Sequence, residues 1–285
     1  MYLFKNVSGL RAFLEPFRTK NRAIGFVPTM GALHEGHLSL IRESLAATHC
    51  TVCSIFVNPT QFNQQADLEQ YPRTPAKDLQ MLYEVGCQAV FMPTVEAIYP
   101  PGLDTSVAVD FGQLAEGMEG RFRPGHFQGV AQVVKRLLDI VQPSHLYMGQ
   151  KDYQQCFLVR HMAQALALPV EVVMSPTVRE ANGLAMSSRN ARLNPEQRKQ
   201  AAIIYKTLQD AGAWIKQGLP PAEVQEKALQ QLTIPGFRPE YFEIINGQTL
   251  QQLNEAQPDR MVVACTAVWA GEVRLIDNLI LQTGS

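Results

Sequence analysis

The chain has 285 residues, of which 46% are hydrophobic and 18% charged, and its formal net charge is −1. This composition is typical of a soluble globular protein with one large or two smaller domains. A net charge near zero offers no basic surface to nucleic acid, so DNA or tRNA binding is not expected. No apolar run reaches the roughly 18 residues of a membrane span, and the N-terminal segment lacks signal-peptide features, so we expect no membrane contact.

The predicted elements alternate between strands and helices over the first part of the chain. In chain order, we expect helix 7–19 with Ser8 as N-cap, strand 22–29, helix 37–48, strand 51–58, helix 74–85, strands 88–93 and 105–111, a helix through 130–141, strand 144–148, helix 153–168 and strand 170–175. Thr74 and Pro75 provide the start signal of the third helix. This alternation predicts right-handed βαβ units and a parallel sheet covered on both faces.

The pattern changes near residue 179, where a polar segment is followed by helices 195–216 and 221–232 and then by strands 241–245, 261–269 and 273–278. Helices followed by clustered strands predict a small α+β unit. We therefore expect two domains, 1–178 and 179–285, the second acting as a lid.

The five cysteines are odd in number and widely scattered: Cys50, Cys53, Cys87, Cys156 and Cys265. This argues against a disulfide framework and for a reducing, cytoplasmic compartment. Cys50 and Cys53 fit C-x-x-C, but they enter a strand-like segment, in which residues three apart face opposite sides. We interpret them as structural thiols rather than as a redox or metal site.

The segment with most chemical content runs from Pro28 to His37 and reads Pro-Thr-Met-Gly-Ala-Leu-His-Glu-Gly-His. It lies between an apolar strand and a helix. Free backbone N–H groups and the positive end of a helix dipole attract anions at such a turn. His34 and His37 stand at that turn, so we expect a phosphate site.

Three alternatives to a phosphate site are a zinc site, another nucleotide-binding motif and simple helix capping. A zinc-protease motif needs histidines four apart, whereas these are three apart and have no obvious third ligand. No G-x-G-x-x-G follows a strand and no P-loop is present, which excludes those nucleotide motifs. The histidines could also simply cap the helix. Polar segments also follow strands 51–58 and 144–148, at residues 58–62 and 149–155. The carboxyl ends of parallel strands meet at one edge of the sheet, where ligands bind, which weakens the capping interpretation.

Several blocks together resemble one family. H-x-G-H with a late serine-and-base segment is similar to the nucleotidylyltransferase superfamily, and five blocks resemble pantothenate synthetases more closely: residues 28–37, 56–62, 123–127, 149–155 and 186–190. The resemblance implies a Rossmann-like parallel sheet with helices on both faces, plus a smaller α+β C-terminal domain. It also implies a homodimer.

The activity implied by the resemblance is an ATP-dependent, AMP-forming pantoate–β-alanine ligase. Pantoate attacks the α-phosphate of ATP in the presence of Mg²⁺, giving pantoyl adenylate and pyrophosphate, and the amine of β-alanine then displaces AMP to form pantothenate. Another H-x-G-H nucleotidylyltransferase, such as a cytidylyltransferase, and a non-catalytic nucleotide-binding module remain alternatives.

The site residues implied by the resemblance fall into four groups. The catalytic residues are His34, His37, Lys151 and Arg189. The ATP-binding residues are Met30, Gly31, Ala32, Leu33, His34, Glu35, Gly36, His37, Gly149, Gln150, Lys151, Asp152, Val178, Met186, Ser187, Ser188 and Arg189. The residues for pantoate and β-alanine are Gln61, Gln155, Asn58 and Arg123. Asp78 matches a position near the magnesium, while Lys77 occupies an adjacent position that is often acidic in the family.

Overall fold

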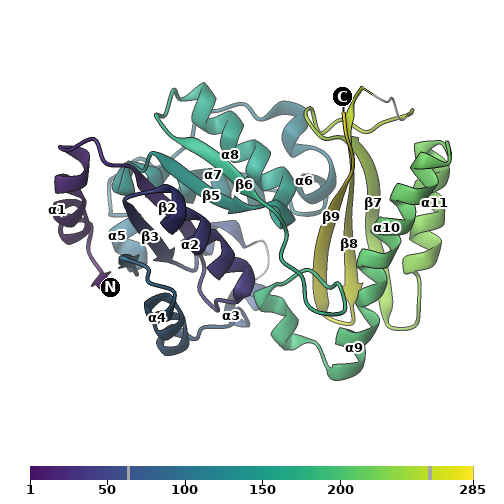
Figure 1. Ribbon diagram of the computed structural model, residues 1–285, viewed down its shortest axis with the longest axis horizontal. Coiled ribbons are helices and arrows are strands. Elements are labelled where there is room, and N and C mark those ends of the chain that lie inside the picture. Colours follow the sequence, from purple (N-terminus) through teal and green to yellow (C-terminus); the bar gives the residue numbers. More distant parts are fainter. Residues whose placement is uncertain (63–64, 256–258, 285) are drawn as a thin grey trace. The chain divides into compact units, whose positions relative to one another are not determined.

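A computed structural model describes residues 1–62, 65–255 and 259–284. The chain forms two compact units (Figure 1). The first contains Met1–Phe111, Arg123–Gln150 and Gln155–Pro176, and the second contains Gly112–Phe122, Lys151–Gln154 and Thr177–Ser285. Whether 1–178 and 179–285 act as a domain and its lid stays a prediction.

The first unit is built on a parallel six-stranded sheet in the order β1-β4-β3-β2-β5-β6. Its strands are β1 (Tyr2–Phe4), β2 (Ile24–Thr29), β3 (Cys50–Ile55), β4 (Ala89–Phe91), β5 (His145–Gly149) and β6 (Glu171–Ser175). From β2 the chain proceeds outward through β3 to β4, and from β5 it proceeds outward in the opposite direction to β6. The strand order therefore reverses between β2 and β5, which is where such sheets bind ligands.

Helices and short 3₁₀ turns connect these strands. They are α1 (Val7–Arg18), α2 (Glu35–Ala47), η1 (Pro59–Gln61), α3 (Gln65–Glu69), α4 (Pro75–Glu84), α5 (Val95–Ile98), α7 (His126–Val141), η3 (Gln150–Asp152) and α8 (Tyr153–Ala165). Leu40 and Ile41 of α2 and Leu82 of α4 pack with Val27 and Val90 on one face of the sheet.

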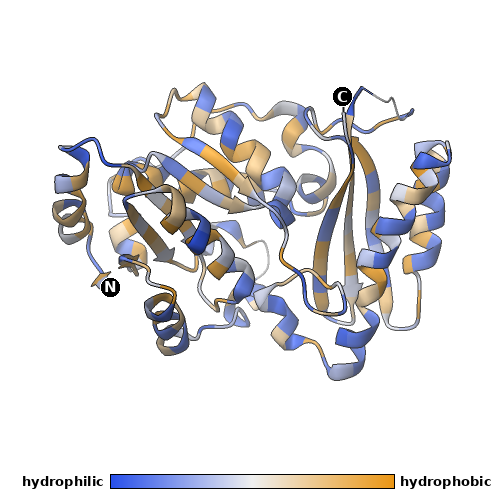
Figure 2. Cartoon of the chain, in the orientation of Figure 1, coloured by the Kyte–Doolittle hydropathy of each residue, from blue (hydrophilic) through white to orange (hydrophobic). Residues whose placement is uncertain are grey.

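The opposite face of this sheet is buried as well. Phe26, Val52 and Leu146 alternate with the residues of the first face and are fully buried. Hydrophobic residues are correspondingly frequent along the strands (Figure 2). The predicted parallel sheet with helices on both faces is confirmed.

The second unit contains an antiparallel sheet in the order β7-β8-β9. Its elements are η2 (Gly112–Ala115), α6 (Met118–Phe122), η4 (Ser188–Arg192), α9 (Pro195–Gln200), α10 (Ala202–Lys216), α11 (Pro221–Leu232), β7 (Phe237–Asn246), β8 (Met261–Ala270) and β9 (Val273–Thr283). Apolar residues of α10 and α11, such as Leu208 and Val224, form one core with Ile244, Val268 and Leu275 of the sheet. The predicted small α+β unit is confirmed.

Three local predictions were wrong. Residues 105–111 form no strand: Gln128 and Gln132 of α7 donate side-chain hydrogen bonds to Val107 and Thr105, respectively. The N-cap of α1 is Asn6, whose side chain accepts from the backbone N–H of Gly9, and not Ser8.

The third wrong prediction is the single helix 195–216. It is divided into α9 and α10 at Ala201, whose carbonyl accepts a hydrogen bond from the N–H of Ile204, three residues later. That is 3₁₀ geometry, which tightens the backbone between the two helices.

Candidate active site

The turn after β2 has an unusual backbone. Gly31 has φ +80° and Ala32 has φ +48°, so two successive residues lie in the left-handed region. That conformation is easy for glycine but costs alanine about 1 kcal/mol. The turn leads directly into α2, as predicted.

Asp78 stabilises this turn from outside it. Its side chain is buried, and its carboxylate accepts hydrogen bonds from the backbone N–H of Ala32 (2.9 Å) and of Leu33 (2.8 Å). The Thr74 hydroxyl donates a third bond at 3.0 Å. Hydrogen bonds to an ionised acceptor are the strong ones, so Asp78 offsets the backbone cost at Ala32. Sequence reasoning missed this contact.

His34 and His37 are held by the backbone through one ring nitrogen each. Nδ1 of His34 accepts from the N–H of Gly36 at 3.1 Å, and Nδ1 of His37 accepts from the N–H of His34 at 3.3 Å. The ring centroids lie 4.0 Å apart. A neutral imidazole whose Nδ1 accepts must carry its proton on Nε2, so Nε2–H is the donor of each ring.

Capping and phosphate binding are therefore compatible. His34 is the N-cap residue of α2, and the two side chains form a reciprocal capping box. Capping uses Nδ1 and fixes the ring orientation, while Nε2 belongs to the opposite edge of each ring. The capping interaction, which stood as an alternative to the functional interpretation, is therefore compatible with it, and the functional interpretation stays a prediction.

A second group of predicted residues surrounds η1. Gln61 donates from Nε2 to the sulfur of Met30 at 3.1 Å and accepts at Oε1 from Nδ2 of Asn58 at 3.3 Å. Asn58 is 1% exposed; its Nδ2 also donates to the Gly129 carbonyl, and its Oδ1 accepts from the Tyr99 hydroxyl at 2.9 Å. The buried Asn58 side chain thus restrains the amide of Gln61.

The backbone of Gln61 is held by a residue to which sequence reasoning gave no role. The Nδ1–H of His126 donates to the Gln61 carbonyl at 2.9 Å, which leaves Nε2 of the neutral ring to accept from Arg123 at 3.1 Å. Arg123, His126 and Gln61 are therefore linked in series. The arginine-glycine segment before α7 in the sequence was the available signal.

The segment after β5 lies in η3. Lys151 is half-buried, with its Nζ 3.9 Å from a carboxylate oxygen of Asp152, and its carbonyl accepts a hydrogen bond from Nδ2 of Asn278 at 2.9 Å. Gly149 ends β5 and Gln150 begins η3. Gln155 is half-buried in the first turn of α8, and its approach to Gln61 stays a prediction.

The late serine-and-base segment forms a defined structure in the second unit. The N–H of Met186 donates to the carbonyl of Val178 at 3.0 Å, closing a short hairpin. Ser187 then caps η4, its hydroxyl accepting from the N–H of Arg189 at 3.3 Å. Met186, Ser187, Ser188 and Arg189 are all half-buried, so this segment is ordered rather than a solvated linker.

Asp78 alone does not build a metal site. Its carboxylate already accepts three hydrogen bonds. In the described part of the chain, no three or more acidic, histidine or cysteine side chains form a group that could hold a metal ion. Mg²⁺ is usually bound through substrate phosphates and one or two carboxylates, so it needs few protein ligands. Any contact between Asp78 and the metal stays a prediction.

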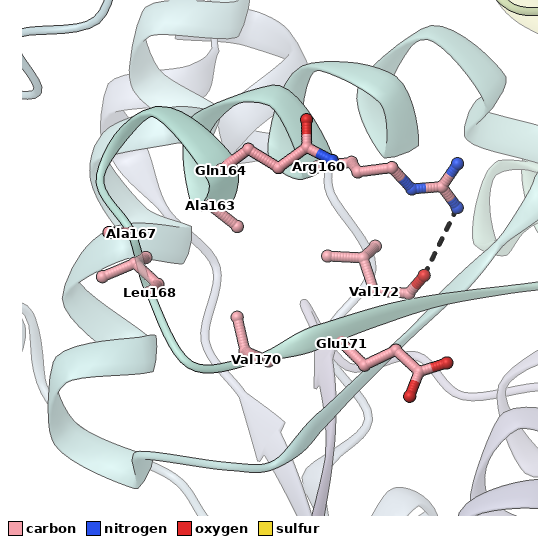
Figure 3. Close-up of a pocket in the computed structure, with 8 residues that line it drawn as sticks. All are labelled: Arg160, Ala163, Gln164, Ala167, Leu168, Val170, Glu171 and Val172. Atoms are coloured by element: carbon pink, nitrogen blue, oxygen red, sulfur yellow. Dashed lines mark hydrogen bonds between the residues drawn. The ribbon is translucent and has the colours of Figure 1, made fainter.

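A cavity of about 410 Å³ lies elsewhere in the first unit (Figure 3). It is lined by the end of α8 and the start of β6, with Arg160 donating to the Val172 carbonyl at 3.3 Å. Ligands of open α/β sheets bind at the carboxyl ends of the strands. This cavity lies at the amino end of β6, so we do not assign it to the predicted chemistry.

The cysteines are structural in character. All five are free and buried. Burial raises the pKa of the Cys50 thiol to about 11 and that of Cys87 to about 12, so both are protonated at neutral pH.

Across the described ranges, no helix has the length and apolar character needed to cross a membrane.

Comparison with known proteins decides between the remaining alternatives. The model of the pantoate-beta-alanine ligase family matches residues 2–280. The chain belongs to this family. Pantothenate synthetase of Porphyromonas gingivalis is 47% identical over 284 residues, covering 98% of this chain and 99% of that protein. The enzyme of Pseudomonas fluorescens Pf0-1 is 45% identical and covers 99% of this chain and 98% of its own.

Solved structures agree with this assignment. The crystal structure of pantothenate synthetase from Thermus thermophilus has a TM-score of 0.92 and 43% identity, covering 99% of this chain and 100% of that chain. Pantoate-beta-alanine ligase from Francisella tularensis, complexed with beta-gamma ATP and beta-alanine, has a TM-score of 0.81 and 33% identity, covering 100% and 99% of the two chains. The predicted ligase family is confirmed, and the cytidylyltransferase alternative is not supported.

Proposed function

We propose that this chain condenses (R)-pantoate with β-alanine to form pantothenate, in two steps that consume ATP and release pyrophosphate and AMP. In the first step a carboxylate oxygen of pantoate attacks the α-phosphorus and pyrophosphate leaves. In the second step the amine of β-alanine attacks the acyl carbon and AMP leaves. Neither step needs a protein nucleophile, so positioning and electrostatic stabilisation are the protein's main contributions.

The observation that carries this proposal is the orientation of the two histidines. Backbone N–H groups occupy Nδ1 of His34 and of His37, so Nε2 is the donor of each neutral ring. Donors fixed in advance stabilise charge that builds on phosphate oxygens without reorganising during the reaction. The N-terminus of α2 adds the favourable end of a helix dipole.

Pantoate recognition is proposed to centre on Gln61 and Gln155. An amide offers a donor and an acceptor without adding charge, which suits a hydroxy acid. Hydrogen bonds from Asn58 and His126 restrain the Gln61 side chain and backbone, respectively. Such restraint lowers the entropy lost when substrate binds, which supports a role for Asn58 in positioning rather than in direct contact.

The ATP contacts are proposed to come from Met30–His37, Gly149–Asp152, Val178 and Met186–Arg189. Lys151 and Arg189 supply cations that complement phosphate charge, and the Arg189 guanidinium can form two parallel hydrogen bonds to phosphate oxygens. We treat Mg²⁺ as part of the nucleotide substrate, and Asp78 as the candidate protein group near it. We also propose that the enzyme is cytoplasmic and forms a homodimer. Light scattering would test the dimer, because it measures the molar mass in solution.

Pantoate-dependent exchange of labelled pyrophosphate into ATP tests the first step. Trapping with β-alanine tests the second, with pantothenate and AMP formed in equal amounts. A panel of short hydroxy acids measures selectivity for pantoate. Exchange driven by CTP in place of ATP, or ATP binding with no AMP formed from pantoate and β-alanine, would reject the proposal.

A further inference from the structure

Two adjacent residues of β9 connect separate segments of the second unit. The backbone N–H of Asn278 donates to Oδ1 of Asp277 at 2.7 Å, and Nδ2 of Asn278 donates to the carbonyl of Lys151 at 2.9 Å. Both side chains are buried, with 4% and 2% of the residues exposed, respectively. The strand therefore fixes the backbone at Lys151 through a side chain distant in sequence.

Asp277 also holds Arg179 through a two-pronged ion pair. The two terminal nitrogens of Arg179 lie 2.6 and 3.0 Å from Oδ2 and Oδ1 of Asp277, and they also donate to the carbonyls of Gly183 and Asn278. The guanidinium carbon lies 3.8 Å from the centroid of the Tyr205 ring. Burial raises the pKa of the Asp277 carboxyl, and the Arg179 charge opposes that shift.

Arg179 is part of the hairpin that precedes the late serine segment. It pairs with Ala185 in an antiparallel bridge, and the next hydrogen bond of the hairpin joins Met186 to Val178. The turn approaches Tyr205 so closely that a Cβ added to Gly183, whose φ is +92°, would lie 2.7 Å from that ring. Ser187 follows at once, so the placement of Arg179 sets where the segment begins.

We propose that Asp277 and Asn278 are positioning residues for ATP, which hold Lys151 and the hairpin ending at Met186 in one fixed arrangement. This inference rests on the proposed function, because that function assigns both segments to the nucleotide. Neither residue needs to touch ATP. A rigid connection prevents the two segments from moving independently, so less conformational entropy is lost on binding.

The test variant is Asn278→Ala, which removes the bond to Lys151 and keeps the Asp277–Arg179 ion pair. ATP binding is measured by calorimetry, and steady-state kinetics give KM for ATP and for β-alanine. Losing one restraining hydrogen bond is expected to weaken ATP binding by about five- to tenfold. KM for ATP should rise in parallel, whereas KM for β-alanine should stay within about twofold.

The matched control is Arg274→Lys, in the same strand and unit. Arg274 is a half-buried arginine, which forms ion pairs with Glu119 and Glu240, and these three residues are not among the predicted site residues. It should lower the unfolding midpoint and leave the ATP dissociation constant unchanged. Asp277→Asn, which retains shape but removes the carboxylate that balances the Arg179 charge, should weaken ATP binding at least as much as Asn278→Ala.

Unchanged ATP affinity in folded Asn278→Ala would overturn the inference, as would equal weakening in Arg274→Lys. Because calorimetry measures ATP affinity without catalysis, it distinguishes failure of the positioning role from failure of the proposed function. If the wild-type protein binds ATP but shows no pantoate-dependent exchange, the proposed function fails while the affinities still judge the positioning role. If the wild-type protein does not bind ATP, both are rejected.

Discussion

Replacing Asp78 with asparagine tests how the turn after β2 is held. The carboxylate accepts the N–H groups of Ala32 and Leu33 at 2.9 and 2.8 Å and is 1% exposed. An asparagine side chain has one acceptor oxygen, so its amide nitrogen must face one of those N–H groups. One charge-assisted bond is lost and one donor is left without an acceptor.

The expected cost follows from these contacts. A hydrogen bond to a charged group contributes about 1.5–3 kcal/mol, and an unsatisfied buried donor costs about 1–3 kcal/mol. The two costs partly describe the same lost contact, so they do not add in full. We therefore expect Asp78→Asn to lower the free energy of unfolding by about 2–4 kcal/mol. The positive φ at Ala32 should then relax, which moves His34 and slows adenylation.

Urea unfolding measures the stability change, and pyrophosphate exchange measures the first step. Asp139→Asn is the control, since Asp139 forms a partly exposed ion pair with Lys135 in the same unit, and it should change stability by no more than about 0.5 kcal/mol. Titration with Mg²⁺ separates two roles of Asp78: activity that returns at high Mg²⁺ indicates metal contact, whereas a loss independent of Mg²⁺ indicates support of the turn. If Asp78→Asn kept wild-type stability and a wild-type exchange rate, Asp78 would not support the turn after β2 and the turn would not depend on it to position His34.

Three further predictions concern other parts of the chain. His37→Ala should fold and lose about 10²–10³-fold in pyrophosphate exchange, the effect of removing one fixed donor; a normal exchange rate would exclude phosphate stabilisation. Gly129→Ala would place a Cβ 2.3 Å from the carbonyl oxygen of Thr60, so we expect a loss of about 1–3 kcal/mol in stability and a higher KM for pantoate, with KM for ATP unchanged. Burial raises the pKa of Cys50 from 9.0 to about 11, so the unfolded chain releases this proton at lower pH than the folded chain. The contribution of Cys50 to stability should be complete below pH 9 and decline as pH rises from 9 to 11. Urea unfolding of Cys50→Val should show a smaller loss of stability over that window. A loss equal to that of the wild type would contradict the raised pKa of Cys50.

The sequence by itself determined the alternation of strands and helices and the motif that indicates the family. Apolar runs alternating with helical periodicity established the parallel sheet, because both patterns follow from local backbone geometry. The turn from Pro28 to His37 could be located because glycine, histidine and a following helix are adjacent in the chain. Sequence reasoning failed at residues 105–111, which accept hydrogen bonds from side chains of α7 and form no strand.

The tertiary structure decided how the site residues are held. Asp78 reaches the turn across 46 residues to Ala32, and Asn278 reaches Lys151 across 127 residues. Such contacts leave no periodic trace in one sequence, since they depend on which strand ends and helices meet in space. The tautomers of His34 and His37 were also beyond the sequence, because they follow from the N–H groups that approach Nδ1 in the folded turn. Local chemistry therefore predicted the phosphate motif, and packing between distant segments fixed the geometry of the turn that carries it.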